Sequence, residues 1–206
     1  EQIREAIREQ EPEKSKVEKT EKIESLFKMV GVDPSVIERF HHELSGGMKQ
    51  RAIIELALSC DPKVVIADEP TTALDVVIQD QILKEIKKVQ ELLGLSLIYI
   101  SHDIAVIAEM TNRMAVMYAG RVVESGPTAE IFANPRHSYT KALLEYTPSV
   151  VGDRVKLNSL DGEQPSIIDE IPGCSFAPRC PNKTTTCKQE LALKLVEDGP
   201  DTQVDL

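Results

Sequence analysis

Three short stretches between residues 44 and 103 carry residue types that suit phosphate chemistry. The first reads LSGGMKQR at 44–51; Ser45 is a good N-cap, and Gly46 and Gly47 let the backbone approach a ligand closely. A helix start carries unpaired N–H groups and a partial positive charge, so this stretch suits an anion. We therefore predict a helix from Ser45 to about Ser59 whose beginning faces a phosphate group.

The second and third stretches are apolar strands that end in polar side chains. VVIADEPTTALD at 64–75 ends its apolar run in Asp68 and Glu69, and the apolar residues 97–100 lead into Ser101, His102 and Asp103. Ligands bind beyond the carboxyl ends of parallel strands in open α/β sheets. Taken singly, a Ser-Gly-Gly turn, an acidic pair after a strand and a lone His are commonly structural. The occurrence of all three features in this order within one stretch favours a functional site.

Helices and further strands must position these groups. Asp75 is predicted to cap a long helix that runs to Leu93 and ends at Gly94, so that strand, helix and strand form a parallel βαβ unit. Upstream, the spacing predicts a short first helix, a solvated charged segment up to residue 22, an amphipathic helix over 23–30 and a short helix from Asp33 to about Phe40. Downstream, a short helix is expected over 104–110, a strand pair over 113–124 and two more helices before Pro148.

Composition excludes several function classes. The chain has 206 residues and a net charge of −10, which argues against a nucleic-acid surface, because phosphate neutralisation needs clustered Lys and Arg. The sequence shows no apolar run of the roughly 18 residues that a spanning helix needs, and no signal peptide. We therefore expect a cytoplasmic protein whose membrane connection runs through a partner. Because the chain opens at Glu1 in mid-pattern, we also expect it to be a fragment.

A cysteine-containing loop follows residue 148, where aliphatic periodicity weakens. Cys174, Cys180 and Cys187 are spaced C-x5-C-x6-C, and the remaining cysteine, Cys60, is expected as a small buried hydrophobe on the helix after Ser45. Unpaired structural cysteines, a disulfide and metal ligation compete as interpretations. Metal ligation fits this Pro-rich loop best, although a fourth thiolate is then wanted.

Together these residues resemble the ATP-binding cassette family. LSGGMKQR resembles the family signature, VVIADEP the Walker B strand, TALD the D-loop and His102 the switch histidine. The segments ADEPTTALDVVIQ, YAGRVVESGP and NPRHSYTKALL, together with the late cysteines, narrow the resemblance to the dipeptide and oligopeptide importers. It covers the chain from about residue 20 onward.

The resemblance implies roles for particular residues. Glu69 and His102 would be catalytic, with Glu69 polarising the attacking water and His102 sensing the γ-phosphate. Asp68 would hold Mg²⁺ through water, and the nucleotide, ATP, would be contacted by Ser45, Gly46, Gly47 and Asp75. The subfamily further implies a four-iron, four-sulfur cluster on Cys174, Cys180 and Cys187.

The fold class expected is α/β, a partial ABC ATPase with half of a RecA-like parallel sheet, a helical subdomain and a small irregular C-terminal extension. The predicted domains are a helical subdomain that ends in the signature helix, the C-terminal half of the ATPase core and the cysteine-containing extension, at 1–60, 61–135 and 136–206. No G-x-x-x-x-G-K-[ST] phosphate loop occurs, and none of the ten glycines precedes a Lys. We therefore expect the chain alone to be inactive.

The function expected of the parent protein is ATP hydrolysis that powers a peptide importer. The partners implied are a second ABC ATPase subunit in a homo- or heterodimer, transmembrane permease subunits and, indirectly, an extracellular peptide-binding protein, with no nucleic acid. This places the protein at the cytoplasmic face of the cell membrane. Two alternatives stay open: a DNA-handling ABC-type ATPase, and a non-enzymatic metal-binding interaction module.

Overall fold

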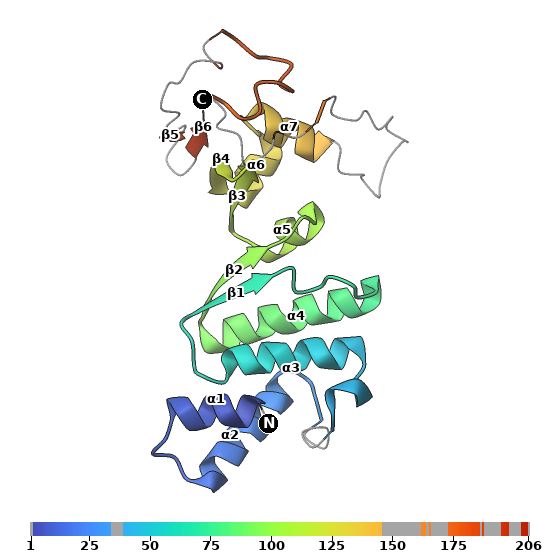
Figure 1. Cartoon of the computed structure of the whole chain (residues 1–206), viewed down its shortest axis with the longest axis vertical. Helices are drawn as coiled ribbons and strands as arrows, with labels where there is room; N and C mark the ends of the chain where they lie inside the picture. The colour runs from blue at the N-terminus through green and yellow to red at the C-terminus, as the bar shows by residue number, and fades with distance from the viewer. Residues whose placement is uncertain are drawn as a thin grey trace. The chain divides into compact units, whose positions relative to one another are not determined.

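The computed structural model folds into two compact units, 1–102 and 103–206, which are described separately (Figure 1). This division is coarser than the three domains expected from the sequence, whose boundaries stay a prediction. None of the helices that the structure describes is both long and apolar enough to cross a membrane. The residues that the structure describes are 2–33, 39–145, 162–163, 165, 173–185, 187, 195–197 and 203–205. The helix expected from Asp33 to Phe40 falls largely outside them.

The first unit consists mainly of helices packed on a two-stranded sheet. Its helices are α1 (Gln2–Gln10), α2 (Lys16–Met29), η2 (His41–Glu43), α3 (Gly46–Leu58) and α4 (Val76–Leu93). Helices α1 to α4 enclose a core of aliphatic side chains and one Phe. Leu95, which follows α4, belongs to the same core. The members of this core are Ile7, Ile23, Leu26, Phe27, Val30, Val32, Leu58, Val89 and Leu95.

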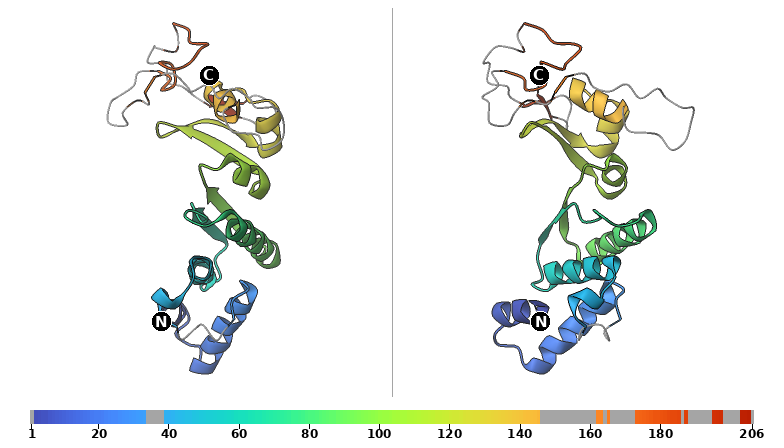
Figure 2. Two further views of the ribbon diagram at one scale, coloured as in Figure 1. Left: turned by 90° about the vertical axis from the view of Figure 1, so that its right-hand side faces the viewer. Right: turned by 45° about the vertical axis from the view of Figure 1, so that its right-hand side comes forward.

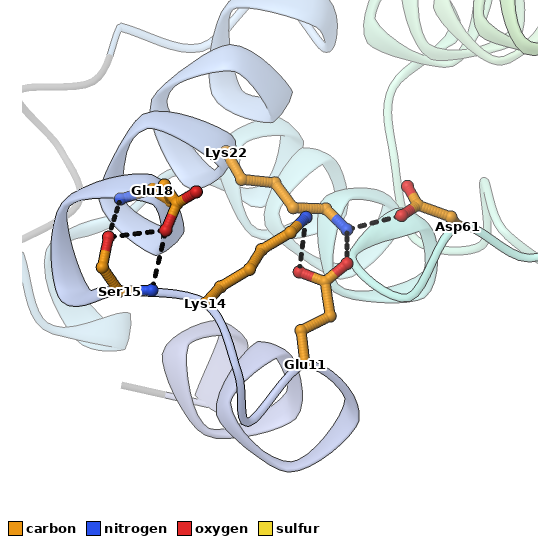
Figure 3. A network of polar contacts seen from close by, with 6 residues as sticks. All are labelled: Glu11, Lys14, Ser15, Glu18, Lys22 and Asp61. Carbon is orange, nitrogen blue, oxygen red and sulfur yellow. Dashed lines mark hydrogen bonds and ion pairs between the residues drawn. The ribbon is translucent and has the colours of Figure 1, made fainter.

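Helix α2 begins earlier than the sequence analysis expected. Ser15 caps it, because the Glu18 N–H donates to the Ser15 hydroxyl (3.3 Å) while the Ser15 N–H donates to the Glu18 carboxylate (2.8 Å), as Figure 3 shows. This reciprocal capping box starts the helix inside the charged run that was expected to be a solvated segment, so that expectation was wrong for residues 16–20. Lys22 then bridges Glu11 (2.9 Å) and Asp61 (2.6 Å), which joins α2 to the ends of α1 and α3.

The two strands of the first unit form the expected βαβ unit with α4. Strands β1 (Val64–Asp68) and β2 (Ser96–Ile100) pair in parallel, with Asp68 opposite Ile100. One face of this sheet packs Val65 and Leu97 against the helical core. The aliphatic side chains of the other face, Val64, Ile66, Ile98 and Ile100, are about half exposed or more. Because the two strands are parallel, their carboxyl ends meet at one edge of the sheet, as predicted.

The second unit is built around an antiparallel sheet of order β3-β4-β6-β5. Ala119 and Gly120 both adopt positive φ (46° and 79°) between β3 and β4, the geometry that a two-residue hairpin turn requires. The helices expected over 104–110, from 128 and from about 138 are all present. The elements are α5 (Ile104–Met110), β3 (Arg113–Tyr118), β4 (Arg121–Pro127), α6 (Thr128–Ala133), α7 (Ser138–Glu145), β5 (Leu195–Glu197) and β6 (Gln203–Asp205).

An aromatic cluster holds the cysteine-containing loop onto this sheet. Phe176 is buried against Tyr118 (ring centroids 5.3 Å apart) and Tyr139 (5.4 Å), and Cys174 and Cys180 pack around the same core. Such edge-to-face aromatic contacts add to the stabilisation from burial alone. The loop of the C-terminal extension is therefore anchored on β3, β4 and α7 of the second unit.

Candidate functional site

The carboxylate of Glu69 lies at the shared carboxyl end of β1 and β2. Its backbone N–H donates to the Ile100 carbonyl (2.9 Å), which carries the parallel pairing one residue past β1. Glu69 adopts φ of 46°, in the left-handed region that a residue with a side chain seldom occupies. The chain turns sharply here, since the Thr72 N–H donates back to the Glu69 carbonyl (3.2 Å). This turn directs Glu69 toward the end of β2.

Glu69 and His102 are in direct contact, as expected for groups that follow neighbouring parallel strands. Glu69 Oε1 lies 2.7 Å from His102 Nδ1 and accepts the His102 backbone N–H (3.1 Å), while Oε2 accepts the Thr72 hydroxyl (3.1 Å). The contact with the His102 side chain lowers the pKa of Glu69. At neutral pH the residue is therefore an ionised hydrogen-bond acceptor. The His102 side chain is 83% exposed, so the pair opens to solvent.

Asp68 is the last residue of β1 and is exposed. Residues alternate between the two faces of a strand, so Asp68 shares its face with Val64 and Ile66. The carboxylates of Asp68 and Glu69 are thus successive along the chain but differ in environment. An exposed carboxylate oxygen at a strand end is the kind of ligand that Mg²⁺ prefers.

The signature stretch begins α3 as the sequence predicts. Ser45 is the N-cap and its hydroxyl accepts the Met48 N–H (3.3 Å). Gly46 is exposed, whereas Gly47 is buried. The start of the helix therefore combines an accessible backbone with the partial positive charge that favours an anion.

Asp75 is the N-cap of α4, where its carboxylate accepts the Ile78 N–H (3.0 Å). Gly94 ends that helix with φ of 62°, again as predicted. A Cβ built on Gly46 would lie 3.5 Å from Leu74 Cδ2, so the signature and the segment before α4 are packed together. The structure thus brings Glu69 next to His102, and Gly46 next to Leu74, just before α4.

The three late cysteines lie on one loop, and each is partly exposed. The Cys174 N–H donates to the Cys187 carbonyl (3.0 Å), and Thr184 contacts Cys187 Sγ through its N–H (3.4 Å) and hydroxyl (3.2 Å). The hydrogen bond with the Thr184 side chain lowers the pKa of Cys187. Within the described residues, no group of three or more His, Cys, Asp or Glu side chains is arranged to hold a metal ion.

Cys60 is exposed, so its expected burial was wrong. Helix α3 ends at Leu58 and Ser59 is its C-cap, so Cys60 no longer follows the helical face that the periodicity assumed. Sequence reasoning also missed Thr72 and Thr184, which orient Glu69 and Cys187. Each stands three residues from its partner, a spacing typical of local turn contacts, but this signal is too common to single them out.

Comparison with known proteins shows which family the chain resembles in sequence. The family model described as "ABC transporter" matches residues 1–72, and that described as "Oligopeptide/dipeptide transporter, C-terminal region" matches residues 123–187. The dipeptide transport ATP-binding protein DppD of Haemophilus influenzae is 46% identical over 190 residues, which is 91% of this chain and 57% of that protein. The Escherichia coli protein of the same name is 46% identical over 177 residues, covering 84% of this chain and 54% of the relative.

A solved structure gives the same result for the fold. CbiO1 of Clostridium perfringens, described as part of an ABC transporter complex, superposes with a TM-score of 0.55 and 32% identity over 59% of this chain and 48% of that one. The chain spans about half the length of the curated relatives it matches. It belongs to the ABC transporter family, in the branch with the oligopeptide/dipeptide transporter C-terminal region.

Proposed function

We propose that this chain is the signature-bearing part of an ATP-binding subunit that hydrolyses ATP to power a peptide importer. The observation that carries the proposal is the Glu69–His102 contact of 2.7 Å at the shared carboxyl end of β1 and β2. Phosphoryl transfer needs positioning, charge neutralisation and a group that orients the attacking water. An ionised, solvent-facing carboxylate held by a histidine meets the last of these needs. The names of the two DppD relatives point to dipeptide transport.

In this proposal each site residue has a definite task. Glu69 accepts a hydrogen bond from the attacking water and orients it, while His102 exchanges its contact with Glu69 for one with the γ-phosphate when ATP is present. Asp68, an exposed carboxylate, suits a water-mediated contact to Mg²⁺, whose charge offsets that of the phosphates when it is bound. Ser45, Gly46, Gly47 and Asp75 act on the nucleotide of a second subunit. The backbone N–H groups at the start of α3 suit the γ-phosphate.

The proposal includes partners that complete the site. A second ABC ATPase subunit, identical or related, supplies the opposing surface, and transmembrane permease subunits receive the motion of the pair. A peptide-binding protein outside the membrane acts through the permease. This arrangement places the chain at the cytoplasmic face of the cell membrane. Because its sequence has no G-x-x-x-x-G-K-[ST] loop, the chain alone should bind ATP too weakly to hydrolyse it.

We also propose that Cys174, Cys180 and Cys187 ligate a metal centre, with a four-iron, four-sulfur cluster as the first candidate. Their common loop, the hydrogen bond that joins Cys174 to Cys187 and the Thr184 contacts to Cys187 Sγ support this, because such clusters are held by thiolates that accept hydrogen bonds. When bound, the cluster would cross-link a loop that has little core of its own. Ultraviolet–visible spectra of anaerobically purified protein test this. Visible absorption that reduction bleaches supports the cluster, and a colourless protein without iron refutes it.

The hydrolytic assignment is tested by Glu69→Gln in the full-length subunit. The substitution keeps the size of the side chain but removes its charge, so ATP turnover should fall by about two orders of magnitude or more. ATP-dependent pairing of the subunits, measured by size-exclusion chromatography, should persist. Glu91→Gln on the exposed side of α4 is the matched control and should leave turnover unchanged. Unimpaired ATPase activity in Glu69→Gln would overturn the assignment.

A further inference from the structure

The second signature glycine, Gly47, is packed against α4 on the side where a side chain would stand. Gly47 is buried, and a Cβ built on it would lie only 3.0 Å from Ile78 Cγ2 and 4.0 Å from a guanidinium nitrogen of Arg51. Gly46, beside it, faces Leu74. The absence of both side chains thus allows the start of α3 to lie directly on the start of α4. The two helices run next to each other in the views of Figures 1 and 2.

One turn further along α3, an ion pair joins the same two helices. Arg51 Nε donates to Glu85 Oε2 and the neighbouring Nη2 donates to Oε1, both at 2.7 Å, so the guanidinium meets the carboxylate through two parallel hydrogen bonds. The two side chains are only 16% and 25% exposed. Two-point contacts of this kind fix orientation as well as distance, and partial burial shields them from salt.

Glu85 also contacts the end of α2. A Cβ built on Gly31, whose φ is 70°, would lie 3.3 Å from Glu85 Oε1, so the carboxylate occupies the space that this glycine leaves. Three helices of the first unit therefore converge on one carboxylate. Another ion pair of α4, Lys84–Asp80, joins neighbours along one helix and is more than half exposed.

We propose that the Arg51–Glu85 pair is a positioning element for the reaction: it holds the signature N-terminus, capped by Ser45, in a fixed orientation to the D-loop and to Asp75 at the start of α4. This inference rests on the proposed function, because it assumes that both N-termini act on one nucleotide. Arg51 and Glu85 touch neither nucleotide nor metal. They act through α3 and α4, whose starts carry Ser45 and Asp75.

The first test measures hydrogen exchange in the 206-residue chain and needs no ATP. Glu85→Gln and Arg51→Lys should both increase exchange at the amides of Met48 and Lys49, whose N–H groups donate to the Ser45 hydroxyl and carbonyl, because each variant loses the two-point contact. The charge-swapped double variant Arg51→Glu, Glu85→Arg should recover part of the protection. Asp80→Asn, on the same helix, is the matched control and should leave these amides unchanged. Equal protection in all variants would overturn the proposal.

The second test measures ATPase kinetics in the full-length subunit. Arg51→Lys should lower kcat/KM for ATP by about tenfold, because a displaced signature reduces productive contacts with the nucleotide. Its melting temperature should stay close to that of the wild-type protein, and the charge-swapped variant should regain activity. A loss of activity that only follows a loss of folded protein contradicts a positioning role. If the wild-type subunit itself shows no hydrolysis, the proposed function fails, whereas the exchange result still decides whether the pair orients the signature.

Discussion

Among the described residues, each unit of this chain buries one carboxylate completely, and the two carboxylates lie in opposite surroundings. Glu55 on α3 and Glu124 on β4 are both 0% exposed. The Glu124 oxygens accept the backbone N–H groups of Arg136 (2.9 Å) and His137 (3.0 Å). Among the residues that the structure describes, neither oxygen of Glu55 has a hydrogen-bond partner, and burial raises the pKa of this residue to about 8.

The difference shows where donors for a buried carboxylate come from. Inside helices the backbone N–H groups are already used by the i−4 carbonyls, so Glu55, surrounded by helices, finds none. Glu124 faces the start of α7, where N–H groups before the first turn are still unpaired. Glu69 follows the same rule as Glu124, because it accepts the N–H of His102 beyond the end of β2. Glu69, the proposed catalytic carboxylate, is thus stabilised by the same kind of backbone donor as Glu124.

The largest expected effect is the pH dependence of stability that Glu55 imposes. With a folded-state pKa of about 8 against 4.5, the folded chain binds more protons than the unfolded chain between these values. Its free energy of unfolding should therefore fall by about 1.4 kcal/mol per pH unit from about pH 5 to 8, and level off above that range. Urea unfolding followed by circular dichroism at several pH values measures this trend.

Glu55→Gln isolates the contribution of the buried carboxyl. The amide has nearly the same shape but does not titrate, so its free energy of unfolding should lack the decline between pH 5 and 8. At pH 8 the variant should be more stable than the wild-type protein. If both chains follow the same pH profile, Glu55 is hydrated or paired in solution and its contrast with Glu124 disappears.

The next effect in size concerns the carboxylate that does have donors. Glu124→Ala leaves two N–H groups unpaired in a buried place, which should destabilise the second unit by about 3 kcal/mol. Glu124→Gln keeps one acceptor oxygen and should cost about half as much. Near-ultraviolet circular dichroism reports on this unit, because Tyr118 and Tyr139 lie in its aromatic cluster. A cost below that of an average surface substitution would show that water replaces the carboxylate.

The sequence predicts what depends on neighbours along the chain. The caps at Ser45 and Asp75, the end of α4 at Gly94 and the turn at Gly120 follow from residue type and spacing alone. The parallel pairing of β1 and β2 follows because the intervening helix requires a crossover connection. This pairing then places Glu69 beside His102, so the centre of the candidate site could be predicted without coordinates.

Contacts between distant segments could not be predicted in this way. The Arg51–Glu85 pair spans 34 residues, and β4 pairs with β6 about 80 residues further on, at Glu124 opposite Val204. The burial of Glu55 could not be predicted from the sequence either, because a Glu in a helix normally lies on the solvated face. Helical periodicity identifies the face of a helix that is apolar, but not the polar residues that its neighbours cover.

The smallest expected effect concerns Glu18, an exposed carboxylate. It tests whether a backbone donor adds to stability at the surface as it does in the interior. Glu18 accepts the Ser15 N–H in the capping box of α2, at the surface rather than in the interior. Glu18→Ala removes the carboxylate that accepts the Ser15 N–H and should lower the free energy of unfolding by about 1 kcal/mol, less than either buried substitution, because water can replace the lost acceptor. Thr20→Ala, within the same helix, is the control and should change stability by a few tenths of a kcal/mol, because its hydroxyl only bonds back to the Lys16 carbonyl. If Glu18→Ala matched Glu124→Ala in cost, burial would not be what separates Glu18 from Glu124, and their local backbone geometry would have to explain the difference.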